Sequence, residues 1–253
     1  MTTIHPVIDL HAHAGRWGSV GVDDDPDRYV EIMDEAGIDR TCINCIFYGD
    51  ATMGNDTVAR FIDRYPDRFV GVAFVTPHYP EEAIPELERA YDSLGFKMLK
   101  VYPPYALIPL TDPKWAPIFE WCDARSAVVM SHSDLGMPGD HLHRPRLFAE
   151  VARMYTNVSW VLGHAGNLEA GRVEAVEAAK HAPNIYLETA TSWGGNGAIE
   201  FLVEGAGQDR VLFGSDMPLM DARYQIGRVA TSAISDEAKH AVLGGNAARL
   251  LGL

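Results

Sequence analysis

The chain has 253 residues, of which 47% are apolar, and this is ordinary for a folded globular protein with a sizeable core. Its formal net charge of -14 speaks against nucleic acid or an anionic membrane as a partner, because phosphate-rich surfaces are bound by basic patches. Three cysteines make no disulfide framework, and we recognise neither a secretory signal nor a membrane-spanning apolar run. We therefore expect a cytoplasmic protein that acts on a small molecule.

Short apolar or β-branched runs alternate with longer segments of helical periodicity along the whole chain. The predicted strands are Val7–His11, Thr41–Tyr48, Phe69–Thr76, Phe96–Tyr102, Ala127–His132, Ser159–His164, Ile185–Thr191 and Val211–Asp216. The predicted helices are Pro26–Ala36, Asp56–Arg64, Pro80–Ser93, Lys114–Ala124, Arg146–Tyr155, Leu168–Ala182, Gly197–Gly205 and a C-terminal helical region, Ser235–Leu250. A capping residue followed by proline, as in Asp25-Pro26, supports several of these helix starts.

Eight strand–helix repeats in about 250 residues predict an α/β fold of the (β/α)8 TIM-barrel type. A doubly wound open sheet is the alternative, but it usually has fewer strands or a glycine-rich phosphate loop after the first strand. We find no internal repeat and no linker long enough to divide the chain, so we expect a single domain over residues 1–253. In such a barrel the C-terminal ends of the strands carry the function.

Polar residues gather at the ends of the predicted strands. The first strand ends in Asp9, His11 and His13, which strict alternation would place on one face. The fifth and sixth predicted strands end at His132 and His164. A single histidine at a strand end is more often a hydrogen-bonded core residue than a ligand, so only the whole set points to a metal site.

Imidazole and carboxylate groups together suit a borderline divalent cation such as zinc. The residues that we expect around one metal ion are His11, His13, His132 and Asp216, with His164 beside it. Asp9 lies deeper in the strand, so we expect it to support the ligands by hydrogen bonds and not to bind the ion.

Seven sequence motifs point to a known family. They are IDLHAH at 8–13, YPDRFVGVAFV at 65–75, GFKMLKVYPPY at 95–105, VVMSHSD at 128–134, VLGHAGN at 161–167, LFGSDMP at 212–218 and GNAARLLGL at 245–253. With these motifs the chain resembles the amidohydrolase superfamily, in particular the amidohydrolase-related branch that contains aminocarboxymuconate-semialdehyde decarboxylase, resorcylate decarboxylases and several lactonases.

The resemblance implies His11, His13, His132 and Asp216 as metal ligands and His164 as a catalytic histidine. It also implies one divalent metal ion, which we expect to be zinc, with manganese as an alternative, and it implies a homodimer. TatD-like deoxyribonucleases are less similar, because they expect a glutamate at the fourth strand and this chain has none there.

Five residues near the predicted barrel mouth are candidates for substrate contacts: Arg16, Trp17, Lys100, Tyr102 and Trp193. Arg16 and Trp17 suit an anionic or aromatic substrate. Alternation puts Lys100 and Lys97 on opposite faces, so only one of them can face the barrel interior, and Lys100 is equally well explained as a buried barrel lysine. Tyr102 stands where many relatives carry histidine in a Lys-x-His-Pro pattern. His141 and His143 resemble a second metal pair, but their loop position favours a role at the rim.

Two reactions fit such a metal site. We expect a hydrolase of a small ester, lactone or amide, in which Asp216 orients a metal-activated water and accepts its proton while His164 stabilises the oxyanion. The alternative is a non-oxidative decarboxylase of an aromatic or unsaturated carboxylic acid, with His164 or Asp216 as the acid. A metal-free barrel that serves as a binding or scaffolding protein is a third hypothesis, and the intact set of expected ligands argues against it.

Overall fold

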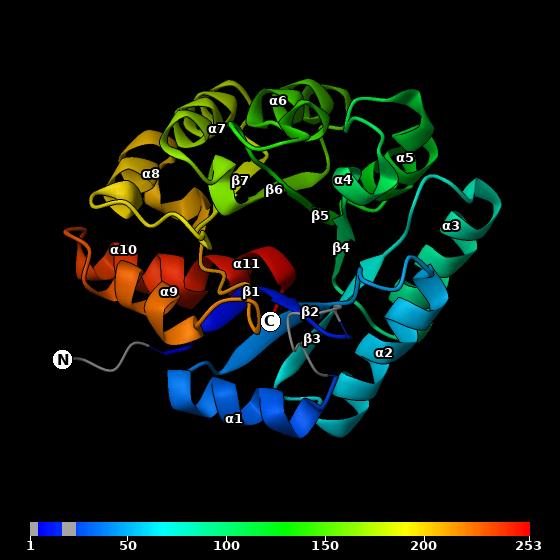
Figure 1. Ribbon diagram of the computed structural model, residues 1–253, viewed down its shortest axis with the longest axis horizontal. Coiled ribbons are helices and arrows are strands. Elements are labelled where there is room, and N and C mark those ends of the chain that lie inside the picture. Colours follow the sequence, from blue (N-terminus) through cyan, green and yellow to red (C-terminus); the bar gives the residue numbers. More distant parts are fainter. Residues whose placement is uncertain (1–4, 17–23) are drawn as a thin grey trace.

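The computed structural model describes residues 5–16 and 24–253 and arranges eight parallel strands in the order β1 to β8. Their bounds are β1 Ile8–His13, β2 Arg40–Asn44, β3 Phe69–Phe74, β4 Met98–Val101, β5 Val128–His132, β6 Ser159–Gly163, β7 Ile185–Glu188 and β8 Val211–Leu212. The two ends of the sheet meet, since the amide of Leu10 donates to the carbonyl of Phe213 over 3.0 Å. The predicted TIM barrel is therefore confirmed, with its helices outside the strands (Figure 1).

The helices follow the predicted pattern with two additions. Their bounds are α1 Pro26–Ala36, α2 Ala51–Arg64, α3 Pro80–Glu88, α4 Pro103–Ala106, α5 Ala116–Ala124, α6 Pro145–Met154, α7 Glu169–His181, α8 Ala198–Ala206, α9 Ala222–Ala230, α10 Asp236–His240 and α11 Asn246–Leu251. The prediction missed α4 and also α9, although the Asp221 side chain caps α9 through the amide of Arg223. No helix in the described part of the chain combines the length and the apolar character needed to cross a bilayer.

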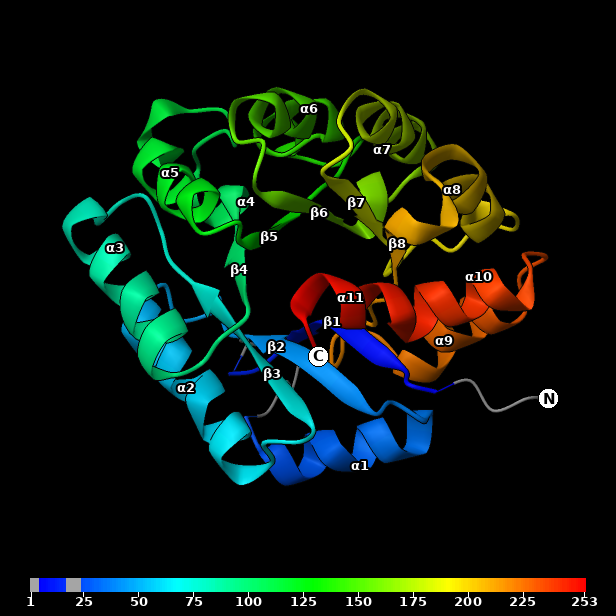
Figure 2. The ribbon, with the colours of Figure 1, turned by 180° about the vertical axis from the view of Figure 1, so that it is seen from behind.

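Alternation along the strands divides the apolar core into two layers. In β4, Met98 packs with the residues inside the barrel, whereas Leu99 packs between the sheet and the outer helices. Ala247 and Leu251 of α11 join the inner layer, and α11 lies across the ring of strands in Figure 2. One end of the barrel is thus closed by apolar packing, which leaves the opposite end, where the strands finish, for polar groups.

Strand β1 departs from strict alternation. Its register against β2 shifts between Asp9 and Ala12, which marks a bulge or irregularity. Leu10 packs inside the barrel and Ala12 packs outside it, so the bulge lets His11 face inward directly after Leu10. The prediction that Asp9 shares one face with His11 and His13 is therefore wrong, because it assumed a regular strand.

Asp9 instead joins β1 to the segment after β8. Its Oδ1 accepts hydrogen bonds from the amides of His11 (3.0 Å) and Ser215 (2.8 Å), and its Oδ2 accepts from the Ser215 hydroxyl (2.6 Å). The carboxyl group is fully buried, and burial raises its pKa to about 7 in spite of these donors. The supporting role expected for Asp9 is thus exerted on the backbone that holds His11, not on an imidazole ring.

We expect Asp9→Ala to lower the free energy of unfolding by about 3 kcal/mol, because it leaves buried donors without acceptors. Asp9→Asn keeps one carbonyl oxygen and should cost less than half as much. Urea denaturation followed by circular dichroism measures both changes. Equal losses in the two variants would contradict this account, since they would show that charge matters more than hydrogen bonding.

Candidate active site

The structure brings the five predicted strand-end residues to one cavity of about 240 Å³. These residues are His11, His13, His132, His164 and Asp216. Two of them adopt backbone conformations that are uncommon outside glycine, with φ of 68° at His164 and 59° at Asp216. This explains why β6 and β8 end before these residues, whereas the sequence predicted strands that included them. The left-handed turns aim both side chains at the cavity.

Three ligand atoms face one another within this cavity. The Nε2 atoms of His11 and His13 are 3.2 Å apart, and Asp216 Oδ1 lies 3.0 Å from His13 Nε2 and 3.5 Å from His11 Nε2. Ligands at about 2.1 Å around a tetrahedral ion are spaced by about 3.4 Å, so these separations fit a single metal ion.

The Oδ1 atom of Asp216 supports the same conclusion. It is buried, and although His13 Nε2 lies 3.0 Å away, it accepts no hydrogen bond of good geometry from any residue that the structure describes. A buried carboxylate oxygen without a donor is costly, and a cation between the three groups would satisfy it. His11, His13 and Asp216 therefore form a group that could hold a metal ion.

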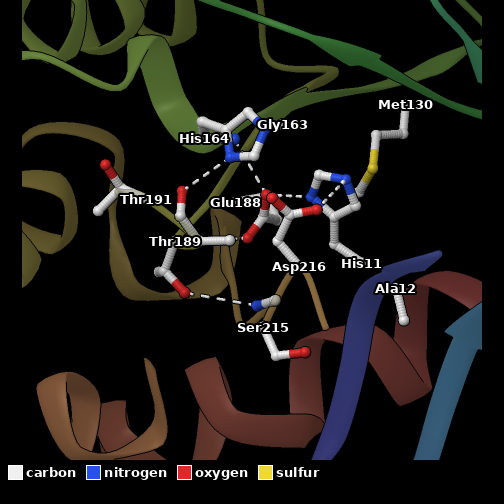
Figure 3. A network of polar contacts seen from close by, with 12 residues as sticks. His11, Ala12, Met130, Gly163, His164, Glu188, Thr189, Thr191, Ser215 and Asp216 are labelled. Atoms are coloured by element: carbon white, nitrogen blue, oxygen red, sulfur yellow. Dashed lines mark hydrogen bonds and ion pairs between the residues drawn. The ribbon is translucent and has the colours of Figure 1, made fainter. Parts of the chain in front are cut away.

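Glu188, at the end of β7, is a functional residue that the sequence analysis missed. It is fully buried, and its Oε2 lies 2.9 Å from His11 Nδ1 and accepts from the amide of His164, also at 2.9 Å (Figure 3). We assign the hydrogen to His11 Nδ1 because the carboxylate accepts, which leaves Nε2 free to bind a cation. The signal for it was an ionisable residue inside a predicted buried strand.

Burial keeps the imidazole rings of His11, His132 and His164 neutral. It lowers the pKa of His132 to about 3 and that of His11 well below its ordinary value, with the positive charge of Lys100 as the next cause for both. Burial, followed by the nearby His132, lowers the pKa of His164 to about 4. Neutral rings offer the lone pairs that metal binding needs. Asp216 differs, since His11 and His13 outweigh its burial and hold its pKa below the usual range.

Lys100 is the lysine of the predicted strand Phe96–Tyr102 that points into the barrel, whereas Lys97 is exposed, and Lys100 lies beneath the cavity. Its Nζ is 2.8 Å from His11 Nε2 and 3.4 Å from the sulfur of Met130. The side chain is fully buried, and burial lowers its pKa to about 8. Lys100 is not part of the cavity wall, so its contact with a substrate stays a prediction.

His132 occupies the cavity but lies outside the three-atom group. Its ring centroid is 4.6 Å from that of His164, and its Nε2 is 3.4 Å from Asp134 Oδ2. Ligation by His132 therefore stays a prediction. His143 is buried, and its ring centroid lies 4.9 Å from that of His132, whereas His141 is exposed. His141 and His143 therefore do not form a metal-binding pair.

The proposed substrate residues divide into two sets. Tyr102 lines the cavity, with its ring centroid 5.2 Å from that of His132. The Arg16 side chain is 79% exposed and faces Asp24, and Trp193 is 52% exposed, so neither forms part of the cavity wall. Trp17 lies outside the described residues.

A curated relative is similar to most of this chain. The 2-amino-3-carboxymuconate-6-semialdehyde decarboxylase of Dictyostelium discoideum is 25% identical over 236 residues, which cover 79% of this chain. The match spans 65% of the length of that relative.

Solved structures show the same fold. The 2,6-dihydroxybenzoate decarboxylase from Rhizobium has a TM-score of 0.80 at 17% identity, with 98% of each chain covered. A dihydroxybenzoic acid decarboxylase from Polaromonas, with bound manganese and an inhibitor, has a TM-score of 0.79 at 20% identity and covers 98% of this chain and 97% of its own. These enzymes are decarboxylases, so the preference for hydrolysis over decarboxylation is wrong, and the comparisons favour the alternative reaction.

The reason for this error lies in the chemistry of the site, since the same imidazole and carboxylate ligands serve both reactions. The family model described as amidohydrolase matches residues 8–253, which include the first and the last of the seven sequence motifs. It covers nearly the whole chain, from the two histidines of β1 to the last residue of the sequence. The chain belongs to the amidohydrolase family.

Proposed function

We propose that the protein is a metal-dependent decarboxylase of a small aromatic carboxylic acid. The observation that carries this proposal is the buried group His11, His13 and Asp216, in a cavity that also presents aromatic and aliphatic side chains such as Phe47, Tyr102 and Leu219. Decarboxylation is the reaction of the relatives that the chain resembles. Manganese is the first ion to test, because it is bound in the Polaromonas enzyme, and zinc is the second.

His11, His13 and Asp216 would hold the ion, and His132 is a further candidate at the same cavity. When bound, a divalent ion supplies positive charge that holds the substrate carboxylate and polarises an adjacent hydroxyl or carbonyl. Glu188 fixes the tautomer and the orientation of His11. Asp9 fixes the backbone of the same residue.

Decarboxylation requires a proton at the carbon that carries the carboxylate. The carbon–carbon bond then breaks, its electron pair returns to the ring, and carbon dioxide leaves. His164 suits the delivery of this proton. Its Nδ1 lies 3.1 Å from the carbonyl of Ala190, which only accepts, so Nδ1 keeps its hydrogen and Nε2 is the nitrogen available at the cavity. Because burial lowers the pKa of His164 to about 4, the ring is neutral at rest, so Nε2 first takes up a proton from solvent and then donates it readily to the carbon.

The proposed reaction is tested with 2-hydroxybenzoate, 2,6-dihydroxybenzoate and a set of small lactones, each added to manganese-loaded protein. We expect carbon dioxide release from at least one of the aromatic acids, because the cavity joins a carboxylate-binding end to aromatic walls. Mass spectrometry of the headspace measures the gas. Hydrolysis of a lactone without any release of carbon dioxide would contradict the proposal.

Metal binding is tested on protein prepared without chelators. We expect one divalent ion per chain by elemental analysis, and a rise in the melting temperature when manganese or zinc is returned to chelator-treated protein, because the ion binds the folded state. His13→Ala removes one of the three facing atoms and should abolish this rise. If no transition metal is bound and the melting temperature does not change, the site does not hold metal.

The proposed roles of two histidines predict different defects. His164→Asn should lower turnover by at least roughly a hundredfold while the metal content stays intact, because it removes the proton donor. His132→Ala should lower the metal content. The exposed His240 provides a matched control, and His240→Asn should change neither quantity. Loss of metal from the His164 variant with full metal in the His132 variant would reverse our assignment.

A further inference from the structure

We infer that the substrate carries a single negative charge, so that the cavity takes an aryl monocarboxylate and rejects a matched dicarboxylate. This inference rests on the proposed function for the reacting carboxylate, and it adds what the remainder of the molecule must be. It comes from the cavity wall opposite the metal-binding group.

Away from the three-atom group, no lysine or arginine that the structure describes lines the cavity. Among the described residues this wall consists of apolar and aromatic side chains, the polar groups Asn167 and Ser192, and the imidazole rings of His132 and His164, which burial keeps uncharged. An amide and a hydroxyl can donate to a substrate hydroxyl, but they do not neutralise a carboxylate. A second carboxylate would lose its hydration in this cavity without gaining a charged partner.

Three cations around the site, Lys100, Arg16 and Arg172, are already engaged or turned away. Lys100 lies beneath the cavity against His11, and the Arg16 side chain faces solvent and Asp24. Arg172 donates to the backbone carbonyls of Asn167 (2.6 Å) and Trp193 (3.4 Å). Residues 1–4 and 17–23, which the structure does not describe, contain neither lysine nor arginine.

Buried acids around the site strengthen the preference for a monocarboxylate over a dicarboxylate. Asp216 forms part of the cavity wall, Glu188 lies behind His11, and Asp134 lies behind His132. One divalent ion together with Lys100 roughly balances these acids, and the substrate carboxylate adds one more negative charge. A further carboxylate would therefore meet like charge at close range in a poorly hydrated space.

A second cavity offers room for an uncharged substituent instead. It has a volume of about 140 Å³ and shares the walls Ile46, Tyr102 and Tyr105 with the first cavity. Its other walls include the buried side chains of Phe74 and Trp115, together with the polar groups Thr76 and His78. An alkyl, aryl or ester group on the substrate ring would find apolar contacts there.

The experiment uses two ligands that differ in one charge. The first is 2-hydroxybenzoate with a carboxylate at the ring 5-position, and the second is the same molecule with a methyl ester at that position. Titration calorimetry on manganese-loaded protein measures binding without relying on turnover. We expect the ester to bind and the diacid to bind about a hundredfold more weakly, the scale expected for a buried charge without a partner.

A matched pair of variants introduces or withholds the missing cation. Leu219 lies half-buried on the cavity wall, so a longer side chain has room there. Leu219→Arg should raise the affinity for the diacid at least tenfold relative to Leu219→Gln, which changes the polarity without adding charge.

Equal or tighter binding of the diacid by the unaltered protein would overturn the inference, and so would binding of neither ligand. Carbon dioxide release is recorded separately in the same samples. If the ester binds preferentially but no aromatic acid loses carbon dioxide, the charge selection holds and the proposed reaction fails.

Discussion

The hydrogen bond between His11 Nδ1 and Glu188 is the contact on which the rest of the site depends. It directs the other nitrogen of His11 toward His13 and Asp216, so that three ligand atoms share one point. The same carboxylate accepts from the amide of His164 and thereby fixes the backbone of the proposed proton donor. One buried acid thus orients both the metal-binding and the proton-transfer parts of the site.

Burying several ionisable groups in one site costs free energy, and Lys100 offsets part of that cost. Lys100 uses the lone pair of His11 Nε2, which is the lone pair that a metal ion would also use. That atom serves one partner at a time, so the contact with Lys100 and the binding of a cation exclude each other. The lysine supplies positive charge beside Asp216 and Glu188 in the absence of an ion, which reduces the cost of burying these acids.

The eight strands and the residues at their ends could be predicted from the sequence because each depends on local pattern. Alternation correctly placed Lys100 and Lys97 on opposite faces, but it failed at Asp9, where a bulge breaks the period of two. Glu188 escaped prediction because its role depends on partners from β1 and β6, and no local pattern encodes such contacts. The exposed positions of Arg16 and Trp193 depend on loop conformation, which periodicity does not describe.

The reaction itself could not be predicted from the metal-binding residues, since hydrolysis and decarboxylation draw on the same ligands. What differs between such enzymes is the wall that meets the unreactive part of the substrate. Here that wall comes from the segments after β2, β4 and β8, through Phe47, Tyr102 and Met220. These side chains offer contact to an aromatic ring and no charge to a second acid. Substrate selection in this barrel therefore depends on the connecting loops, while the strand ends supply the shared chemistry.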